Sequence, residues 1–152
     1  MKIKKSQTAD TRTCDWSKVS KEQLLQSSEQ HIKDVQKGLD FIRNLLKEKA
    51  QNHDYTKIDL IDEFYSDFQT GFEKTGWWEK HQKIERHHFN NSEYIQDDIN
   101  LLDVLEQIVD GVMAGMARSG EYRCEPISDE LLQKAYKNTA KLLLDNIEID
   151  NN

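Results

Sequence analysis

The near absence of proline is the feature that most restricts the fold of this chain. Proline occurs once in 152 residues, as Pro126, and there are only six glycines. Proline and glycine are the residues that most often interrupt helices, so long stretches are free to be helical. Several glycines, such as Gly71, Gly76 and Gly120, stand at the edges of these stretches. The sequence therefore predicts an all-α fold with little room for strands.

Apolar residues recur at spacings of three and four in several segments, which is the pattern of amphipathic helices. Ser20 and Gln23 have the spacing of a capping box ahead of the first segment. The segment INLLDVLEQIVDGVMAGMA is the most apolar and is expected to form the central buried helix. The helices are expected at about 18–50, 54–70, 72–88, 99–117 and 128–147. Together they predict a bundle of about five helices.

The chain is expected to form one domain. Its 152 residues suffice for one hydrophobic core, and the composition shows no break along the chain. The helical domain is expected over residues 17–147. Residues 1–16 and 148–152 lie outside the periodic segments, so we expect flexible termini there.

The charge of the chain excludes some partners. The formal net charge is −7 and the sequence pI is about 5.2, so a long nucleic acid would be repelled. No signal peptide and no apolar run of about 18 residues is visible, which predicts a cytoplasmic protein that does not enter a membrane. Cys14 and Cys124 have no zinc-finger spacing and are expected to be reduced thiols.

The histidines are concentrated in one part of the sequence. His53 is followed directly by Asp54, and the expected central helix carries Asp110 between Val109 and Val112. Neutral imidazole and carboxylate oxygen are ligands that suit first-row transition metals. A buried carboxylate on an apolar helix also needs a partner, and a metal ion is one such partner. The candidate ligands are His31, His53, Asp54, His81, His87, His88 and Asp110.

The stretch HQKIERHH permits two arrangements. If its helix continues, His88 lies within about 20° of His81 around the axis, while His87 points about 120° away. His81 and His88 would then share a face. If the helix breaks near Arg86, His87 becomes the better ligand. A solvated polar stretch is the alternative to either arrangement.

The order of these residues resembles the HD-domain superfamily of metal-dependent phosphohydrolases. Its signature of a His, an HD pair and a distant Asp is matched by His31, by His53 with Asp54, and by Asp110. NHDYTK is similar to the extended HDxxK form, with Lys57 on the same helix face as Asp54. The likeness covers roughly residues 28–120. With WWEKHQKIERHH and LLDVLEQIVDGVMAGMARSG, the chain looks like short HD-like proteins of phages and bacteria.

The resemblance implies a centre of one or two divalent ions. Asp54 would bridge them, His31, His53 and Asp110 would complete one site, and the histidines of 81–88 would hold the other ion. The metals that suit these ligands are manganese, iron, zinc, cobalt and nickel, and magnesium is compatible. Glu106, four residues before Asp110, is a candidate to orient a ligand histidine, and a solvated role is its alternative.

The activity implied is hydrolysis of a small phosphate ester, with a nucleotide as the expected substrate. Asp54 and Lys57 are the expected catalytic residues. Lys57, Arg86 and Arg118 are the candidates to contact phosphate, although Lys57 could instead pair with Asp54. Trp77 and Trp78 are expected in the core rather than stacked on a base.

Other functions fit the same residues. Some relatives of this type hold two irons and oxygenate small organic substrates. A non-catalytic helical module that binds a nucleotide or a protein is the second alternative, and an acidic interaction protein with surface histidines is the third. A homo-oligomer is compatible with each of them.

Overall fold

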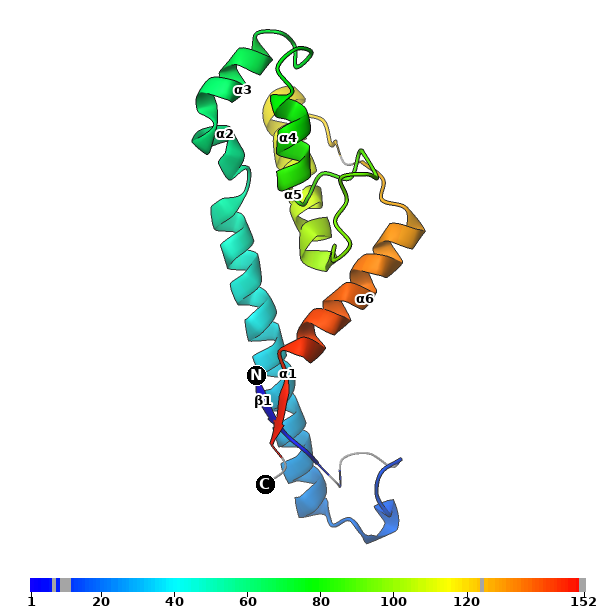
Figure 1. Cartoon of the computed structure of the whole chain (residues 1–152). Helices are drawn as coiled ribbons and strands as arrows, with labels where there is room; N and C mark the ends of the chain where they lie inside the picture. Colours follow the sequence, from blue (N-terminus) through cyan, green and yellow to red (C-terminus); the bar gives the residue numbers. More distant parts are fainter. Residues whose placement is uncertain (7, 9–11, 124, 151–152) are drawn as a thin grey trace. The chain divides into compact units, whose positions relative to one another are not determined.

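The computed structural model describes residues 1–6, 8, 12–123 and 125–150, and it is mostly helical. This confirms the all-α prediction. Cys124, expected to be a reduced thiol, lies outside the described residues. The helical elements are η1 (Trp16–Lys18), α1 (Lys21–Asn52), α2 (Tyr55–Asp59), α3 (Ile61–Phe68), α4 (Trp77–Ile84), α5 (Leu101–Ser119) and α6 (Asp129–Asp145) (Figure 1).

The helix boundaries differ from the expected ones in two places. The segment expected as one helix over 54–70 is two helices, because the backbone at Leu60 leaves the helical conformation between α2 and α3. The helix expected over 72–88 is shortened to α4, which ends at Ile84. At the start of α1 the capping box is present: Gln23 N donates to Ser20 Oγ at 3.2 Å, and Ser20 N donates to Gln23 Oε1 at 2.9 Å.

The two ends of the chain form a strand pair, where flexible termini were expected. β1 (Lys2–Lys4) runs parallel to β2 (Glu148–Asp150), with Ile3 opposite Ile149. Backbone hydrogen bonds between the strands satisfy polar groups that a loose terminus would leave to water. The termini of the described chain are therefore paired.

The contacts divide the chain into two compact units. The single helical domain expected over residues 17–147 stays a prediction. The first unit comprises Met1–Leu45 and Lys141–Asn152, and it contains the strand pair, η1, most of α1 and the end of α6. The second unit comprises Leu46–Ala140 and contains the end of α1, α2 to α5 and most of α6. No helix of the described residues is long and apolar enough to cross a membrane.

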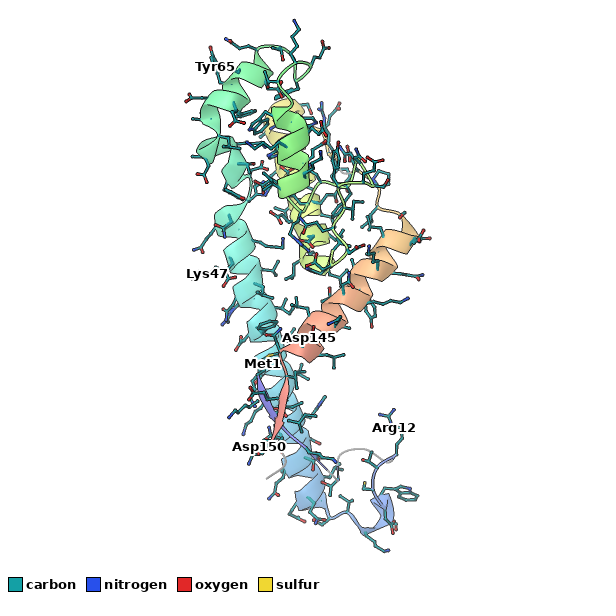
Figure 2. All side chains as sticks on the ribbon, viewed as in Figure 1. Met1, Arg12, Lys47, Tyr65, Asp145 and Asp150 are labelled. Atoms are coloured by element: carbon teal, nitrogen blue, oxygen red, sulfur yellow. The ribbon has the colours of Figure 1, made fainter. Side chains whose placement is uncertain are left out.

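The buried apolar residues lie in the second unit. They are Trp77, Ile99, Leu102, Val104 and Ala135. Helices α2, α3 and α4 pack on one another, and the Trp77 ring stacks on Phe64 with 4.3 Å between ring centroids. Exposed side chains surround the helices, among them Lys47 and Tyr65 (Figure 2).

Helix α5 is less buried than a central helix was expected to be. Its first turn is buried at Leu102, Asp103 and Val104, whereas Val109 and Met113 are exposed. The helix begins with a capping box, in which the Asn100 side chain accepts from Leu102 N and Asp103 Oδ2 accepts from Asn100 N. Its N-terminal end is therefore fixed in the core, and one face of its middle is exposed.

Candidate metal centre

The turn after α1 presents the His-Asp pair. Helix α1 ends at Asn52 and α2 begins at Tyr55, so His53 and Asp54 form the whole connection. Asp54 has φ 55° and ψ 25°, in the left-handed region. This conformation costs a non-glycine residue about 1–2 kcal/mol, and aspartate adopts it more readily than most residues. Strained backbone of this kind is frequent at functional sites.

The end of α4 brings the other histidines to the same place. Glu85 is extended and a turn follows at residues 86–87, so the chain leaves the helical path just before His87. Of the two arrangements expected for HQKIERHH, the break near Arg86 is the one observed. The break does not force a choice between His87 and His88, because both reach the neighbourhood of Asp54.

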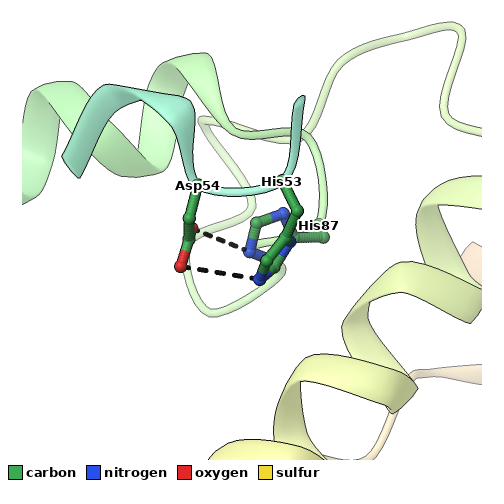
Figure 3. A group of neighbouring side chains, drawn as sticks. All are labelled: His53, Asp54 and His87. Carbon is green, nitrogen blue, oxygen red and sulfur yellow. Dashed lines mark ion pairs between the residues drawn. The ribbon is translucent and has the colours of Figure 1, made fainter. Parts of the chain in front are cut away.

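The first cluster, here named the His53 group, contains His53, Asp54 and His87 (Figure 3). Nε2 of His53 is 3.6 Å from Oδ2 of Asp54, and Nε2 of His87 is 3.5 Å from Oδ1. Asp110 lies beside the group: its carboxylate oxygens are 3.8 Å from His53 Nε2 and 3.9 Å from His87 Nε2. Four side chains from three parts of the second unit thus converge.

The second cluster, here named the His81 group, contains Asp54, His81 and His88. Nε2 of His81 is 3.4 Å from Oδ1 of Asp54 and 2.9 Å from Nε2 of His88. His81 is fully buried, and its ring stacks on Trp77 with 4.7 Å between centroids. Asp54 therefore belongs to both groups.

Glu106 orients the His53 ring and lies beside the His87 ring. Its Oε1 is 3.1 Å from His53 Nδ1 and 3.4 Å from His87 Nδ1. Burial raises the pKa of Glu106, but contacts with His87, Lys49 and His53 outweigh burial and bring that pKa down to about 2. An ionised carboxylate only accepts, so His53 donates to it through Nδ1. The other ring nitrogen, Nε2, faces Asp54 and Asp110 and is the atom that would bind a metal ion.

A buried relay fixes His81 in the same way. The Thr56 hydroxyl donates to Glu85 Oε1 at 2.7 Å, and Thr56 N donates to the same oxygen at 3.2 Å. The hydroxyl has one proton, so its contact of 2.6 Å with His81 Nδ1 is one in which the imidazole donates. The Nε2 of His81 therefore has no proton, so it accepts from His88 Nε2 at 2.9 Å and lies 3.4 Å from Oδ1 of Asp54.

The imidazoles of the His81 group are neutral at pH 7. Burial lowers the pKa of His81 to about 4, and the neighbouring His88 adds to the effect. Burial likewise lowers the pKa of His88 to about 4, with a contribution from His87. Neutral imidazole is the form that binds a metal ion.

The donor atoms fit a divalent metal. Oδ1 of Asp54 and both ring nitrogens of His87 are buried without a hydrogen-bond partner among the described residues. Imidazole lone pairs facing carboxylate oxygens repel one another unless a cation lies between them. Metal-ligand bonds of about 2.0–2.2 Å place two ligands of one ion about 3–4 Å apart, as these atoms are. The residues present therefore fit first-row ions with nitrogen and oxygen ligands.

The two groups do not include His31. It lies in the first unit, on the exposed surface of α1, and belongs to neither cluster. Its role as a ligand stays a prediction. Lys57 forms an ion pair with Oδ2 of Asp54, the alternative foreseen for it. Burial raises the pKa of Asp54, but the hydrogen bond and the charge of Lys57 outweigh burial and hold that pKa below its ordinary value.

The guanidinium group of Arg86 forms hydrogen bonds to other side chains of the protein. Its Nε and Nη2 donate to the two oxygens of the fully buried Asp103, both at 3.0 Å, and Nη1 donates to Gln96 and to Asp98. Lys49 also reaches Asp103, at 2.6 Å. The guanidinium thus secures α5 to the loop after α4. All its contacts here are within the protein, and its role at a phosphate group stays a prediction.

Arg118 instead lines a cleft beside the centre. This cleft, here named the arginine cleft, has a volume of about 380 Å³. Its lining includes Trp78, His87, His88, Asp110, Arg118 and Arg123. Neither arginine forms an ion pair with a carboxylate of the described residues. Trp77 is buried as expected, whereas Trp78 contributes one wall of the cleft.

Gly115 allows the segment that carries Arg123 to lie against α5 at this cleft. A Cβ at this position would lie 2.5 Å from the Glu121 carbonyl oxygen and 3.0 Å from Arg123 N. The segment that carries Arg123 therefore packs directly on the α5 backbone, which only glycine permits.

Three residues of the site were not predicted from the sequence. Thr56 and Glu85 support His81, and Arg123 faces the arginine cleft. Thr56 stands inside HDYTK, so its position two residues after Asp54 was a usable signal. Glu85 and Arg123 become visible only when the chain has folded, because each acts across the fold.

No family model, curated protein or solved structure matches the chain.

Proposed function

We propose that this chain is a metal-dependent phosphohydrolase with an HD-type fold and centre, acting on a small phosphate ester. The observation that carries the proposal is the position of Asp54. Its carboxylate lies between two histidine groups, and its Oδ1 is buried without a hydrogen-bond partner among the described residues. A carboxylate shared in this way is suited to bridge two ions, the arrangement that the order of His53-Asp54 and Asp110 suggests.

Divalent ions, when bound, lower the pKa of a coordinated water and neutralise the oxygens of a phosphate group. The residues of the chain would orient the metal ligands and bind the phosphate group. Glu106 and the Thr56–Glu85 relay hold His53 and His81 with their Nε2 atoms toward Asp54. Arg118 and Arg123 provide fixed positive charge in the adjoining cleft, where guanidinium groups bind phosphate oxygens in a bidentate manner.

Lys57 has one role in the site without metal and another in the site with bound metal. Its ammonium pairs with Asp54 in the structure. Bound cations would weaken this pairing by competing for the same carboxylate, and Lys57 would then be able to donate to a phosphate oxygen. The proposed substrate is therefore a small phosphate ester held by Lys57, Arg118 and Arg123 at the metal ligands.

A di-iron oxygenase is the second candidate. Four imidazoles and the carboxylates of Asp54 and Asp110 form a set of nitrogen and oxygen donors that iron accepts readily. This candidate predicts iron in protein prepared in air, oxygen consumption with an organic substrate, and no release of phosphate.

The test is a screen of nucleotides, cyclic nucleotides and simple phosphate esters with protein loaded separately with manganese, zinc, cobalt or iron. Wild-type protein and Asp59→Ala are expected to release phosphate, because Asp59 is exposed on α2 and belongs to neither group. Asp54→Ala is expected to fall to background. Absence of hydrolysis by every metal-loaded form of the wild type contradicts the proposal.

A further inference from the structure

A second cleft in the same unit adjoins the metal ligands. The end of α1 and the middle of α5 flank a cleft of about 310 Å³, here named the apolar cleft. Its lining consists of Leu46, Lys49, Ala50, His53, Leu105, Glu106, Val109, Asp110 and Met113. It shares Asp110 with the arginine cleft.

The walls of this cleft are apolar and accessible. Leu105, Val109 and Met113 are spaced four residues apart and form one stripe of α5. Val109 is 58% exposed and Met113 is 64% exposed. Leu46 and Ala50, also four residues apart, line the cleft from α1. Apolar surface of this kind beside a site is stabilised when an apolar group covers it.

Two polar side chains in the lining, Lys49 and Glu106, already have partners. The Lys49 ammonium is 2.6 Å from Asp103 Oδ1 and 2.8 Å from Glu106 Oε2, and Glu106 Oε1 contacts His53. A sugar or a base in this cleft would lose its hydrogen bonds to water and gain few in return. An alkyl or aryl group has no such cost.

One end of the cleft is formed by proposed metal ligands. His53 and Asp110 belong to its lining, and both are partly exposed. On a helix with about 100° per residue, Asp110 lies between the Leu105 stripe and the face that carries Arg118. A molecule at the ligands can therefore extend into the apolar cleft while its charged end faces the arginine cleft.

We infer that the substrate is a phosphate ester whose organic group is apolar, and that the apolar cleft binds this group. The inference rests on the proposed function and narrows it: the phosphate occupies the metal ligands and the arginine cleft, and the hydrocarbon lies against Leu105, Val109 and Met113. It favours alkyl or aryl phosphates over nucleotides, whose sugar and base are polar.

The test measures binding of n-alkylphosphonates from methyl to octyl to zinc-loaded protein by calorimetry. Phosphonates keep the charged head and are not hydrolysed. Each methylene that enters the cleft is expected to raise the affinity by up to about fourfold, until the cleft is full. Methylphosphonate measures the head alone, so it tests the proposed phosphate site independently of the chain.

Three variants locate the effect. Met113→Gln makes the wall polar, and Ala50→Phe fills the cleft. Both variants are expected to bind methylphosphonate with an affinity within about twofold of that of the wild type. Neither is expected to bind longer alkylphosphonates more tightly than methylphosphonate. Met116→Gln is the matched control, because Met116 is 55% exposed on the same helix and lines neither cleft. This control is expected to keep the full gain.

The outcomes separate the two proposals. If zinc-loaded protein binds methylphosphonate but longer chains bind no better, the apolar-substrate inference is wrong and the phosphohydrolase proposal stands. If no phosphonate binds, both fail. If long chains bind equally well to protein stripped of metal by a chelator, the cleft is an independent apolar surface, and the inference is again wrong.

Discussion

The His53 group and the His81 group share Asp54 but differ in what orients their rings. In the His53 group, the ionised carboxylate of Glu106 contacts both imidazoles directly, and Lys49 secures that carboxylate from the other side. In the His81 group, the carboxylate of Glu85 acts through the Thr56 hydroxyl. Asp110 stands beside the first group only.

Because of this difference, the two groups are not equivalent as proposed metal sites. Two carboxylates, those of Asp54 and Asp110, lie near the Nε2 atoms of the His53 group, and negative charge near a cation raises affinity. Among the described residues, only the Asp54 carboxylate lies near the Nε2 atom of His81, and each group has one buried and one partly exposed imidazole. We therefore expect the His53 group to bind its ion more tightly.

Removal of one histidine from either group is expected to have a large effect on the number of metal ions bound. His87→Ala is expected to abolish binding at the His53 group, and His88→Ala at the His81 group, because each group has few donors to lose. Equilibrium dialysis with zinc is expected to give about one ion per chain for each variant and about two for the wild type. Loss of both ions in either variant would show that the groups form a single site.

Glu106→Gln tests the direct support. The amide keeps the shape but removes the charge, and it can present a donor to His53 or His87. Loss of such a supporting group typically lowers metal affinity by about 10–100-fold. The tighter of the two dissociation constants is expected to rise by this amount, while that of the His81 group changes little. An equal change in both constants contradicts the assignment of Glu106.

Thr56→Val tests the relay with a smaller expected effect. Valine has a similar shape but breaks the chain from Glu85 to His81, so the ring loses the partner that fixes its proton on Nδ1. The dissociation constant of the metal ion at the His81 group is expected to rise by about tenfold, which is the lower end of the range for residues that orient a metal ligand. Thr56→Ser keeps the hydroxyl and is expected to restore binding; failure of serine to do so would assign the effect to packing.

Asp67→Asn tests the scaffold below the His81 group and is expected to leave both metal constants nearly unchanged. Asp67 is fully buried and accepts from Thr75 N and Trp78 N, both at 3.0 Å, at the start of α4. Burial raises its pKa, but these hydrogen bonds outweigh burial, so the folded pKa lies below the ordinary value near 3.8.

The sign of the pH effect follows from this depressed pKa. The ionised form stabilises the fold above about pH 4, and this contribution is lost as the pH falls through the folded pKa. Asp67→Asn is therefore expected to be less stable than wild type at pH 7 and to differ less from it at pH 3. Thermal unfolding of metal-free protein at both pH values measures this. A constant difference between the two proteins would contradict the role of the charge.

The sequence predicted much of the fold because few residues interrupt the helices. The helical class and the Ser20 capping box depend on local properties, and both are observed. The β1–β2 pair could not be predicted in the same way, since it joins residues about 145 positions apart. The division at Leu45 also depends on contacts far apart in the sequence.

The candidate site was predictable for the residues that follow one another in a recognisable order along the sequence. It was not predictable for the residues whose role depends on contacts across the fold. His53, Asp54, His81, His87 and His88 were expected together, and the structure brings them together. The pairing of Arg86 with the buried Asp103 was not predicted, because sequence spacing does not show that α5 begins with an acid in need of a partner. Arg123 was missed because its approach depends on Gly115.

The metal stoichiometry of Asp54→Ala tests whether one carboxylate serves both groups. Elemental analysis after dialysis against zinc is expected to give about two ions per wild-type chain. Asp59→Ala is expected to match the wild type. Asp54→Ala, folded by circular dichroism, is expected to hold close to none. Two tightly bound ions in folded Asp54→Ala, or none in the wild type after reconstitution, would contradict the account.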